Sequence, residues 1–269
     1  MSSDSAHVLK KRPPRVSYCG GLPFLYELQS IFRLQVYIEK MTRILVVQSR
    51  TSSDWLEREQ KNFRRVIGDL AEIEFLSALD ERLAWSSPDE FLKNADGVIF
   101  GGSSDFDFDG GRTEEDPARL TSLIILARTK NIVQHAISAG TPVLGVCFGH
   151  QLIARMYEGE VRHDAAQGKQ GSHEIHLTGH GVQDRLFKDF PPAFVAQYWH
   201  KDSVTNLPKG AMLLATGPTC LFSVLRYGDN VYTVQFHPEV ERIIIDTHAR
   251  PSPEASRLVP LWIEHIVGQ

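Results

Sequence analysis

The segment TPVLGVCFGHQLIA, residues 141–154, runs from a short apolar stretch through a glycine-flanked cysteine into the start of a helical pattern. Cys147 stands between Gly145 and Gly149, where the predicted strand meets the predicted helix. A reactive side chain on such a turn, with glycines that keep other side chains clear of it, is typical of a nucleophile elbow in an α/β sheet. The turn would present the sulfur at the carboxyl end of the sheet, and it would place the thiolate at a helix N-terminus.

The residues before the elbow alternate short apolar strands with helices. Strands are expected at 43–48, 71–79, 96–102 and 141–147, and helices at 53–70, 87–95 and 117–139, the last one ended by Gly140. This alternation indicates βαβ crossovers. It predicts an α/β fold with an open, mostly parallel central sheet and helices on both faces.

After residue 160 the apolar pattern becomes shorter and two-sided. Strands are expected at 174–179, 193–199, 211–217 and within 221–240, and a terminal helix is expected at 253–269. The tripeptide GDN at 228–230 is a hairpin signal. We therefore expect antiparallel strands to extend the sheet in the C-terminal half.

Length and composition are those of an ordinary globular protein. The chain has 269 residues, 42% of them hydrophobic and 23% charged, and a formal net charge of −4. This charge gives no electrostatic reason to expect nucleic acid or an anionic membrane as a partner. The three cysteines, Cys19, Cys147 and Cys220, fit neither a disulfide framework nor a metal knuckle, which favours a reducing, cytoplasmic location.

The first 40 residues differ from the rest because they hold six basic residues against three acidic ones. Polar residues interrupt their apolar stretch, so neither a signal-peptide core nor a membrane span is expected. We expect an N-terminal extension over residues 1–40 and one domain over residues 41–269. An amphipathic helix, a targeting presequence and an appendage upstream of Met41 remain alternatives for the extension.

A catalytic thiol needs a base, and the segment VQFHPE, residues 234–239, offers one. His237 follows an apolar strand, and Glu239 comes two residues later. A carboxylate at this spacing can fix the tautomer of the imidazole. Taken alone, either motif could be structural, as a buried core cysteine or as an ordinary polar strand end. Together they favour nucleophilic catalysis by Cys147.

The two motifs GVCFGHQ, residues 145–151, and VQFHPE resemble the class I, or triad, glutamine amidotransferase domain that occurs in GMP synthase, over roughly residues 43–245. The resemblance implies a flavodoxin-like fold. It also implies Cys147 as nucleophile, His237 as general base and acid, and Glu239 as the orienting carboxylate. The oxyanion hole implied is made by the amides of Phe148 and of Gly102, which we prefer to Gly101.

The same resemblance implies the lining of the substrate pocket. Gln151 matches the position that contacts the glutamine substrate, and Gly101 lies in the oxyanion turn. The segment QYWHKDSVTNLP, residues 197–208, is similar to the family pattern SHxD…LP and places His200 and Asp202 at the pocket wall. His150, inside the motif, is expected to be structural.

Three positions depart from the family pattern. Ser103-Ser104 stands where the family usually has proline, Glu158-Gly159 replaces a glycine pair, and Lys169 or Gln170 replaces an acidic residue. These changes lie in the pocket rather than among the three catalytic positions. They therefore bear on the substrate more than on the reaction.

The segment DFDFDGGRTEED, residues 105–116, has nearly the carboxylate spacing of a calcium loop, but a strand rather than a helix enters it. We expect a solvated loop beside the active site, with Asp105, Asp107 and Asp109 favouring substrates that carry an amine. The histidines of 173–180 lie on a predicted strand and turn, which does not converge three imidazoles. No metal site is expected.

The resemblance implies hydrolysis of the side-chain amide of glutamine, or of another γ-glutamyl amide, to glutamate and ammonia or an amine. The reaction would pass through a cysteinyl thioester and needs neither a metal nor an organic cofactor. The expected partners are this small molecule and a separate synthetase or ammonia-acceptor subunit. Two alternatives stay open: a stand-alone γ-glutamyl conjugate hydrolase, and a catalytically silent fold used for binding.

Overall fold

The computed structural model describes residues 41–241 and 250–269, which all belong to one compact unit, Met41–Gln269. The expected N-terminal extension, residues 1–40, lies outside the described residues. Its alternatives therefore remain predictions.

Five parallel strands form one half of a nine-stranded sheet: β1 (Arg43–Gln48), β2 (Glu72–Ser77), β3 (Gly97–Phe100), β4 (Val143–Val146) and β11 (Val231–Val234). Their order is β2-β1-β3-β4-β11, with every neighbouring pair parallel. β4 and β11 are thus adjacent although many residues separate them in the chain.

The sheet continues from β11 through antiparallel strands. These are, in order, β10 (Val224–Tyr227), β9 (Ala211–Thr216), β6 (Lys169–Leu177) and β7 (Ala193–His200). A second, two-stranded sheet pairs β5 (Val161–His163) with β8 (Asp202–Val204). The predicted α/β fold with a parallel centre and an antiparallel C-terminal extension is therefore confirmed.

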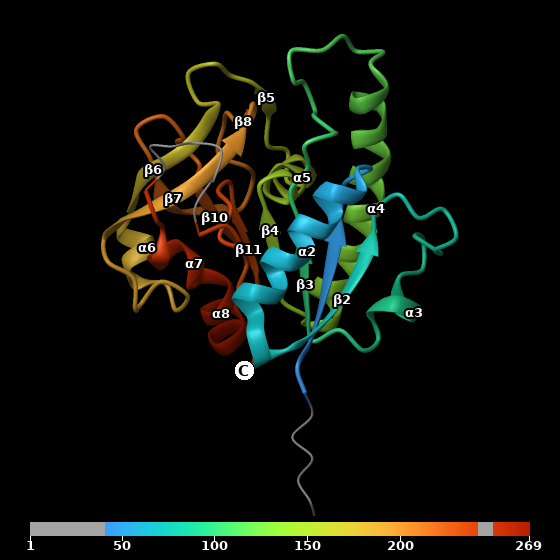
Figure 1. Cartoon of the computed structure of the whole chain (residues 1–269), viewed down its shortest axis with the longest axis horizontal. Helices are drawn as coiled ribbons and strands as arrows, with labels where there is room; N and C mark the ends of the chain where they lie inside the picture. Colours follow the sequence, from blue (N-terminus) through green and yellow to red (C-terminus); the bar gives the residue numbers. More distant parts are fainter. Residues whose placement is uncertain (1–40, 242–249) are drawn as a thin grey trace, which may run out of the picture. The chain divides into compact units, whose positions relative to one another are not determined.

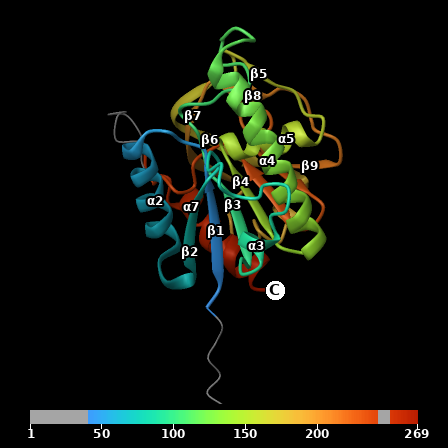
Figure 2. The same cartoon turned by 90° about the vertical axis from the view of Figure 1, so that its right-hand side faces the viewer.

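Helices cover both faces of the sheet, because successive strand residues point to opposite sides. Ile44 and Val46 of β1 pack with α2 (Ser53–Ile67), α7 (Pro253–Ser256) and α8 (Leu258–Trp262). Leu45 and Val47 pack with α3 (Asp89–Leu92), α4 (Pro117–Ala139) and α5 (Phe148–Met156). Figures 1 and 2 show the sheet between these two groups of helices.

Local sequence signals set the ends of α4. The Asp116 side chain caps its N-terminus by accepting the amide of Ala118 at 2.8 Å, and Pro117 fills its first position. Gly140 ends it with a left-handed φ of 73°, as predicted.

Several predicted element bounds are wrong. The predicted terminal helix is divided into α7, α8 and a π-helical turn, η2 (Ile263–Val267). Pro260 gives the reason, because it cannot donate to the carbonyl of Ser256 four residues earlier. The helix predicted at 53–70 ends in a 3₁₀ turn, η1 (Gly68–Leu70), and the strand predicted at 174–179 begins earlier, at Lys169. A short helix, α6 (Gly179–Gln183), was not predicted.

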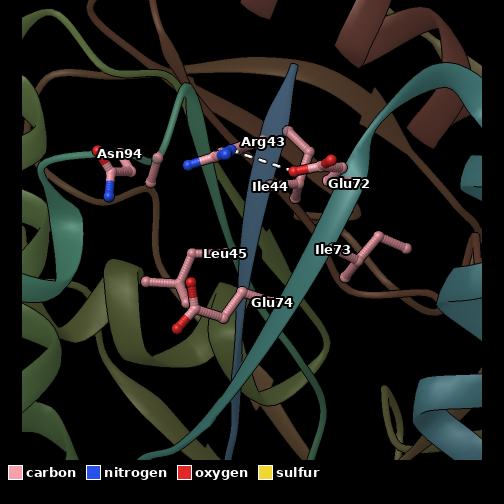
Figure 3. Close-up of a pocket in the computed structure, with 8 residues that line it drawn as sticks. Arg43, Ile44, Leu45, Glu72, Ile73, Glu74 and Asn94 are labelled. Atoms are coloured by element: carbon pink, nitrogen blue, oxygen red, sulfur yellow. Dashed lines mark hydrogen bonds and ion pairs between the residues drawn. The ribbon is translucent and has the colours of Figure 1, made fainter. Parts of the chain in front are cut away.

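The carboxyl ends of the parallel strands β1, β3, β4 and β11 meet at one edge of the sheet, where α/β proteins carry their sites. At the opposite ends of the strands, where β1 and β2 begin, a pocket is lined by Arg43 and Glu72, which form an ion pair at 3.1 Å (Figure 3). It lies at the far end of the strands from Cys147. No helix among the described residues is long and apolar enough to cross a membrane.

Candidate active site

Cys147 occupies the sharp turn between β4 and α5 with φ 52° and ψ −100°, a conformation that favours glycine. The two flanking glycines are required by close packing. A β-carbon at Gly145 would lie 2.8 Å from the carbonyl oxygen of Gly149, and one at Gly149 would overlap the carbonyl oxygen of Phe100. The turn therefore has the strained geometry of a nucleophile elbow.

His237 follows β11 and lies at the same edge of the sheet. Its Nδ1 lies 2.7 Å from Oε1 of Glu239, and both side chains are buried. Burial of the imidazole favours its neutral form, but the charges of Glu239 and Cys147 and hydrogen bonds to both outweigh it, so the pKa of His237 is raised well above its usual value. The protonated imidazole is thus stabilised between Sγ of Cys147 and the carboxylate of Glu239.

Gly102, in the turn after β3, lies against His237 and Cys147. A β-carbon at Gly102 would be 2.9 Å from Cε1 of His237 and 3.5 Å from Cβ of Cys147. The structure therefore brings together Cys147, His237, Glu239 and Gly102, which come from three separate segments of the sequence.

The backbone donors of the expected oxyanion hole differ in availability. Phe148 is the first residue of α5, so its amide is one of the N–H groups without an acceptor inside the helix. The amide of Gly101 donates to the carbonyl oxygen of Val47 at 3.0 Å. The amide of Gly102 donates to Oε1 of Glu59 at 3.1 Å.

Glu59 was missed by sequence reasoning. It lies on α2, in the charged run EREQ, and it is nevertheless buried with only 3% of its surface exposed. Arg50 pairs with it at 3.1 Å, and Gln48 donates to its Oε2 at 2.8 Å. Its burial raises its pKa, and the nearby charge of Glu239 adds to this, while Arg50 and Gln48 act in the opposite direction.

The predicted pocket-wall residues form a separate hydrogen-bonded group. Gln151 donates through Nε2 to the carbonyl oxygen of Asp202 at 2.8 Å and to Oε1 of Gln235 at 3.2 Å. His200 contacts the same carbonyl oxygen through Nδ1 at 2.9 Å. The carboxylate of Asp202 accepts the amides of Asp109 and Gly110, at 2.8 and 2.7 Å.

Two further histidines near the site are held neutral. Burial lowers the pKa of His200 to about 4, and the charge of His237 contributes to this. Burial likewise lowers the pKa of His150 to about 3, and its Nδ1 contacts Oγ1 of Thr233 at 2.8 Å. This environment agrees with the structural role expected for His150.

In the segment of residues 105–116, which we call the acidic loop, Asp105, Asp107 and Asp109 each have their own protein partners. Asp105 accepts from the amide and hydroxyl of Thr51, at 2.6 and 2.8 Å, and Asp107 pairs with Arg112 at 3.1 Å. Asp109 accepts the amides of Gly111 and His163, both at 3.2 Å. Over residues 41–241 and 250–269, no group of three or more His, Cys, Asp or Glu side chains is placed to hold a metal ion.

At each of the three places where the sequence departs from the family pattern, the structure shows a contact or a backbone conformation of the residue present. Ser104 accepts from Nη1 of Arg50 at 3.3 Å, so the turn after Gly102 is tied to the end of β1. Glu158 adopts a left-handed φ of 61°, which explains why glycine is usual there. Lys169 is buried with its ammonium 4.7 Å from the centre of the Tyr198 ring, and burial lowers its pKa.

A family model for class-I glutamine amidotransferases matches residues 85–248. The chain belongs to this family. Among curated relatives, a subunit of the glutamine-hydrolyzing GMP synthase of Methanocaldococcus jannaschii is 39% identical over 118 residues, 43% of this chain and 60% of that protein. The corresponding protein of Archaeoglobus fulgidus is 30% identical over 156 residues, 58% of this chain and 72% of that protein. The amidotransferase chain thus spans 60% of the length of the first curated relatives that it matches.

Solved structures of amidotransferases share the fold. A Thermoplasma acidophilum protein, described as a GMP synthase subunit, superposes with a TM-score of 0.62 at 20% identity, over 85% of this chain and 95% of that one. A glutamine amidotransferase of Thermotoga maritima gives a TM-score of 0.52 at 17% identity, over 83% of this chain and 81% of that one. At these identities the likeness establishes the fold of the amidotransferase, and it agrees with the flavodoxin-like prediction.

Proposed function

We propose that this amidotransferase hydrolyses the side-chain amide of glutamine, or of a γ-glutamyl compound, through a thioester on Cys147. The observation that supports this most directly is the strained elbow of Cys147 beside the buried pair of His237 and Glu239, which are 2.7 Å apart. A fold that used this edge only for binding would have no need of a cysteine in a glycine conformation.

In the first half-reaction, Sγ of Cys147 attacks the carboxamide carbon and a tetrahedral oxyanion forms. The amides of Phe148 and Gly102 are its proposed donors, and one such donor is worth roughly 3 kcal/mol. His237, protonated on Nε2, gives its proton to the leaving nitrogen as the carbon–nitrogen bond breaks. Ammonia or an amine leaves, and the γ-glutamyl thioester remains.

In the second half-reaction, neutral His237 removes a proton from water, which attacks the thioester carbon. The carbon–sulfur bond breaks, glutamate leaves, and the thiolate of Cys147 is restored beside His237, which now carries the proton taken from water. Glu239 holds the ring through Nδ1 at 2.7 Å, so that Nε2 faces the reacting atoms in both steps. These steps call for neither a metal nor an organic cofactor.

We propose Gln151, Gly101, His200 and Asp202 as the substrate-side wall, and a separate synthetase as the acceptor of the ammonia. The M. jannaschii relative is named as one subunit of GMP synthase, which supports a second, separate chain. Cys147 and Cys220 are both free thiols, and the absence of a disulfide between them supports a reducing, cytoplasmic location. Residues 41–269 are proposed as the glutamine amidotransferase-like domain and residues 1–40 as an N-terminal extension.

Ammonia release from free glutamine tests this proposal, with wild type beside Cys147→Ala and a panel of γ-glutamyl amides and peptides. Turnover of free glutamine that is lost in Cys147→Ala supports the amidotransferase reaction. Turnover of γ-glutamyl peptides alone would establish the conjugate hydrolase instead. No turnover on any substrate, with or without a co-purifying synthetase, would favour the silent binding fold.

A further inference from the structure

The carboxylate of Glu59 lies directly behind the oxyanion turn. It reaches the amide of Gly102 at 3.1 Å, and it is held by Arg50 at 3.1 Å and by Gln48 at 2.8 Å. We call these three side chains, Gln48, Arg50 and Glu59, the Glu59 network. All three are buried: Gln48 is the last residue of β1, Arg50 lies in the segment after it, and Glu59 lies on α2.

The glycine at position 101 is matched to this network. A β-carbon there would lie 2.7 Å from Oε1 of Glu59 and 3.0 Å from its Cδ, which is closer than real β-carbons approach. Only glycine therefore lets the carboxylate reach the amide of the next residue. The Gly101-Gly102 pair thus serves the contact with Glu59 as well as the approach to Cys147.

The contact with Glu59 and the proposed oxyanion hole compete for one hydrogen-bond donor, the amide of Gly102. An oxyanion-hole amide must point at the place where the negative oxygen forms. The amide of Gly102 instead donates to a carboxylate, and hydrogen bonds to charged acceptors are about twice as strong as neutral ones. The peptide between Gly101 and Gly102 has to turn before this amide can serve the reaction. Its carbonyl oxygen, on Gly101, then gives up the hydrogen bond from the amide of Gly149 at 3.1 Å.

We propose that Glu59 is a positioning residue that withholds the Gly102 amide from the reacting carbonyl, and that hydrolysis proceeds when this hydrogen bond is exchanged for one to the oxyanion. The proposal rests on the proposed function, because it assumes attack of Cys147 on an amide. It describes a resting form of the site, held by α2.

Arg50 makes the exchange feasible. After Gly102 leaves, Glu59 keeps its ion pair with Arg50 and its hydrogen bond from Gln48, so no buried charge is left alone. Arg50 also contacts Oγ of Ser104, two residues beyond Gly102, at 3.3 Å. The serine that replaces the usual proline thereby links the moving turn to the side chain that stays with Glu59.

The kinetic test compares Glu59→Gln with Glu57→Gln, an exposed glutamate on the same helix. Glutamine is a neutral acceptor, so we expect the kcat for glutamine hydrolysis to rise about tenfold in Glu59→Gln with KM unchanged, and neither to change in Glu57→Gln. The double variant Arg50→Gln, Glu59→Gln removes both charges and should show the same rise if the single variant folds poorly. An unchanged or lower kcat in both Glu59 variants would overturn the proposal.

NMR can observe the Gly102 amide directly, because few glycines in this chain follow another glycine. Gly-Gly pairs occur only at 20–21, 101–102 and 110–111, so glycine labelled with ¹³C at the carbonyl and ¹⁵N at the amide gives three signals in a carbonyl-to-amide correlation. Gly101→Ala identifies the signal of Gly102 by removing it. We expect the amide proton of Gly102 to resonate far downfield in wild type and in Glu57→Gln. In Glu59→Gln its resonance should move upfield. The same frequency in all three proteins would overturn the proposal.

The γ-aldehyde analogue of glutamine separates this proposal from the proposed function. It forms a thiohemiacetal with Cys147, whose oxygen needs the oxyanion donors, whereas iodoacetamide alkylates the thiol without them. Protection of Cys147 from iodoacetamide by the aldehyde should be about tenfold tighter in Glu59→Gln. If protection is tighter in Glu59→Gln but no ammonia is released, the proposed function is refuted and the role of Glu59 is kept. If protection is equal in the two proteins and glutamine is hydrolysed, the role of Glu59 is refuted and the proposed function is kept.

Discussion

The carboxylate of Asp202 fixes the acidic loop, because its two oxygens accept the amides of Asp109 and Gly110 at 2.8 and 2.7 Å. Asp202 lies at the start of β8 and is 1% exposed. The loop of residues 105–116 is therefore anchored to the start of β8 by a buried carboxylate.

Replacing Asp202 by asparagine should loosen this loop. One of the two backbone amides would then face an NH₂ group, and an unsatisfied buried donor costs about 1–3 kcal/mol. We expect the free energy of unfolding in urea to fall by that amount and limited proteolysis between residues 105 and 116 to become faster. Asp69→Asn, on the exposed turn after α2, is the control and should change neither.

The stability contributed by His237 should depend on pH. Its folded pKa lies above the ordinary value of 6.5, so the folded state keeps a proton that the unfolded state releases between the two pKa values. The stabilisation is complete below the unfolded pKa and disappears as the pH rises through the folded one.

Glu239→Gln removes the strongest contribution that raises this pKa. We expect the variant to be less stable than wild type in urea at about pH 6, near the ordinary histidine pKa, with the difference shrinking in alkaline solution. An NMR titration of the His237 imidazole should show the lower pKa directly. A difference that grows with pH would contradict this assignment.

Because of the backbone strain at Cys147, glycine should give a more stable protein than alanine at this position, which is the opposite of the usual order in a helix. With φ at 52°, a side chain at this position is strained, and glycine is not. We expect Cys147→Gly to be more stable than Cys147→Ala by about 1 kcal/mol in urea unfolding. At the exposed helical position Lys130 the order should be the usual one, with alanine more stable than glycine.

Glu158→Gly should stabilise the protein. Glu158 adopts a φ of 61°, and its ion pair with Lys209 is exposed and contributes little. Glycine should therefore raise the free energy of unfolding by roughly 0.5–1 kcal/mol. Lys209→Gln, which removes only the ion pair, should leave the stability within about 0.5 kcal/mol of wild type; a loss of stability in Glu158→Gly would show that the ion pair outweighs the strain.

Local patterns predicted much of the fold. The apolar run at 43–48, the stop at Gly140 and the hairpin turn at 228–230 each depend on neighbouring residues, and each appears as predicted. The proline at 260 was an available signal for the break in the terminal helix and was not used.

The residues around the oxyanion turn could not be predicted in the same way. Glu59 lies in a charged stretch that, on a helix, resembles a solvated face, and its burial depends on where β3 places Gly101 and Gly102. The contact of Asp202 with Gly110 spans 92 positions in the chain, so no local pattern contains it. Both contacts are products of the topology.

The pairing of β4 with β11 has a consequence for biosynthesis. Val146, next to the thiol, faces Val234, whose carbonyl oxygen accepts the amide of Cys147 at 2.8 Å. Of the nine strands of the sheet, β11 is the last to leave the ribosome. Until β11 inserts, β4 has an unpaired edge. Cys147 then lacks both the backbone hydrogen bond to Val234 and the neighbouring imidazole of His237. The hydrolysis proposed above therefore requires β11 to have joined the sheet.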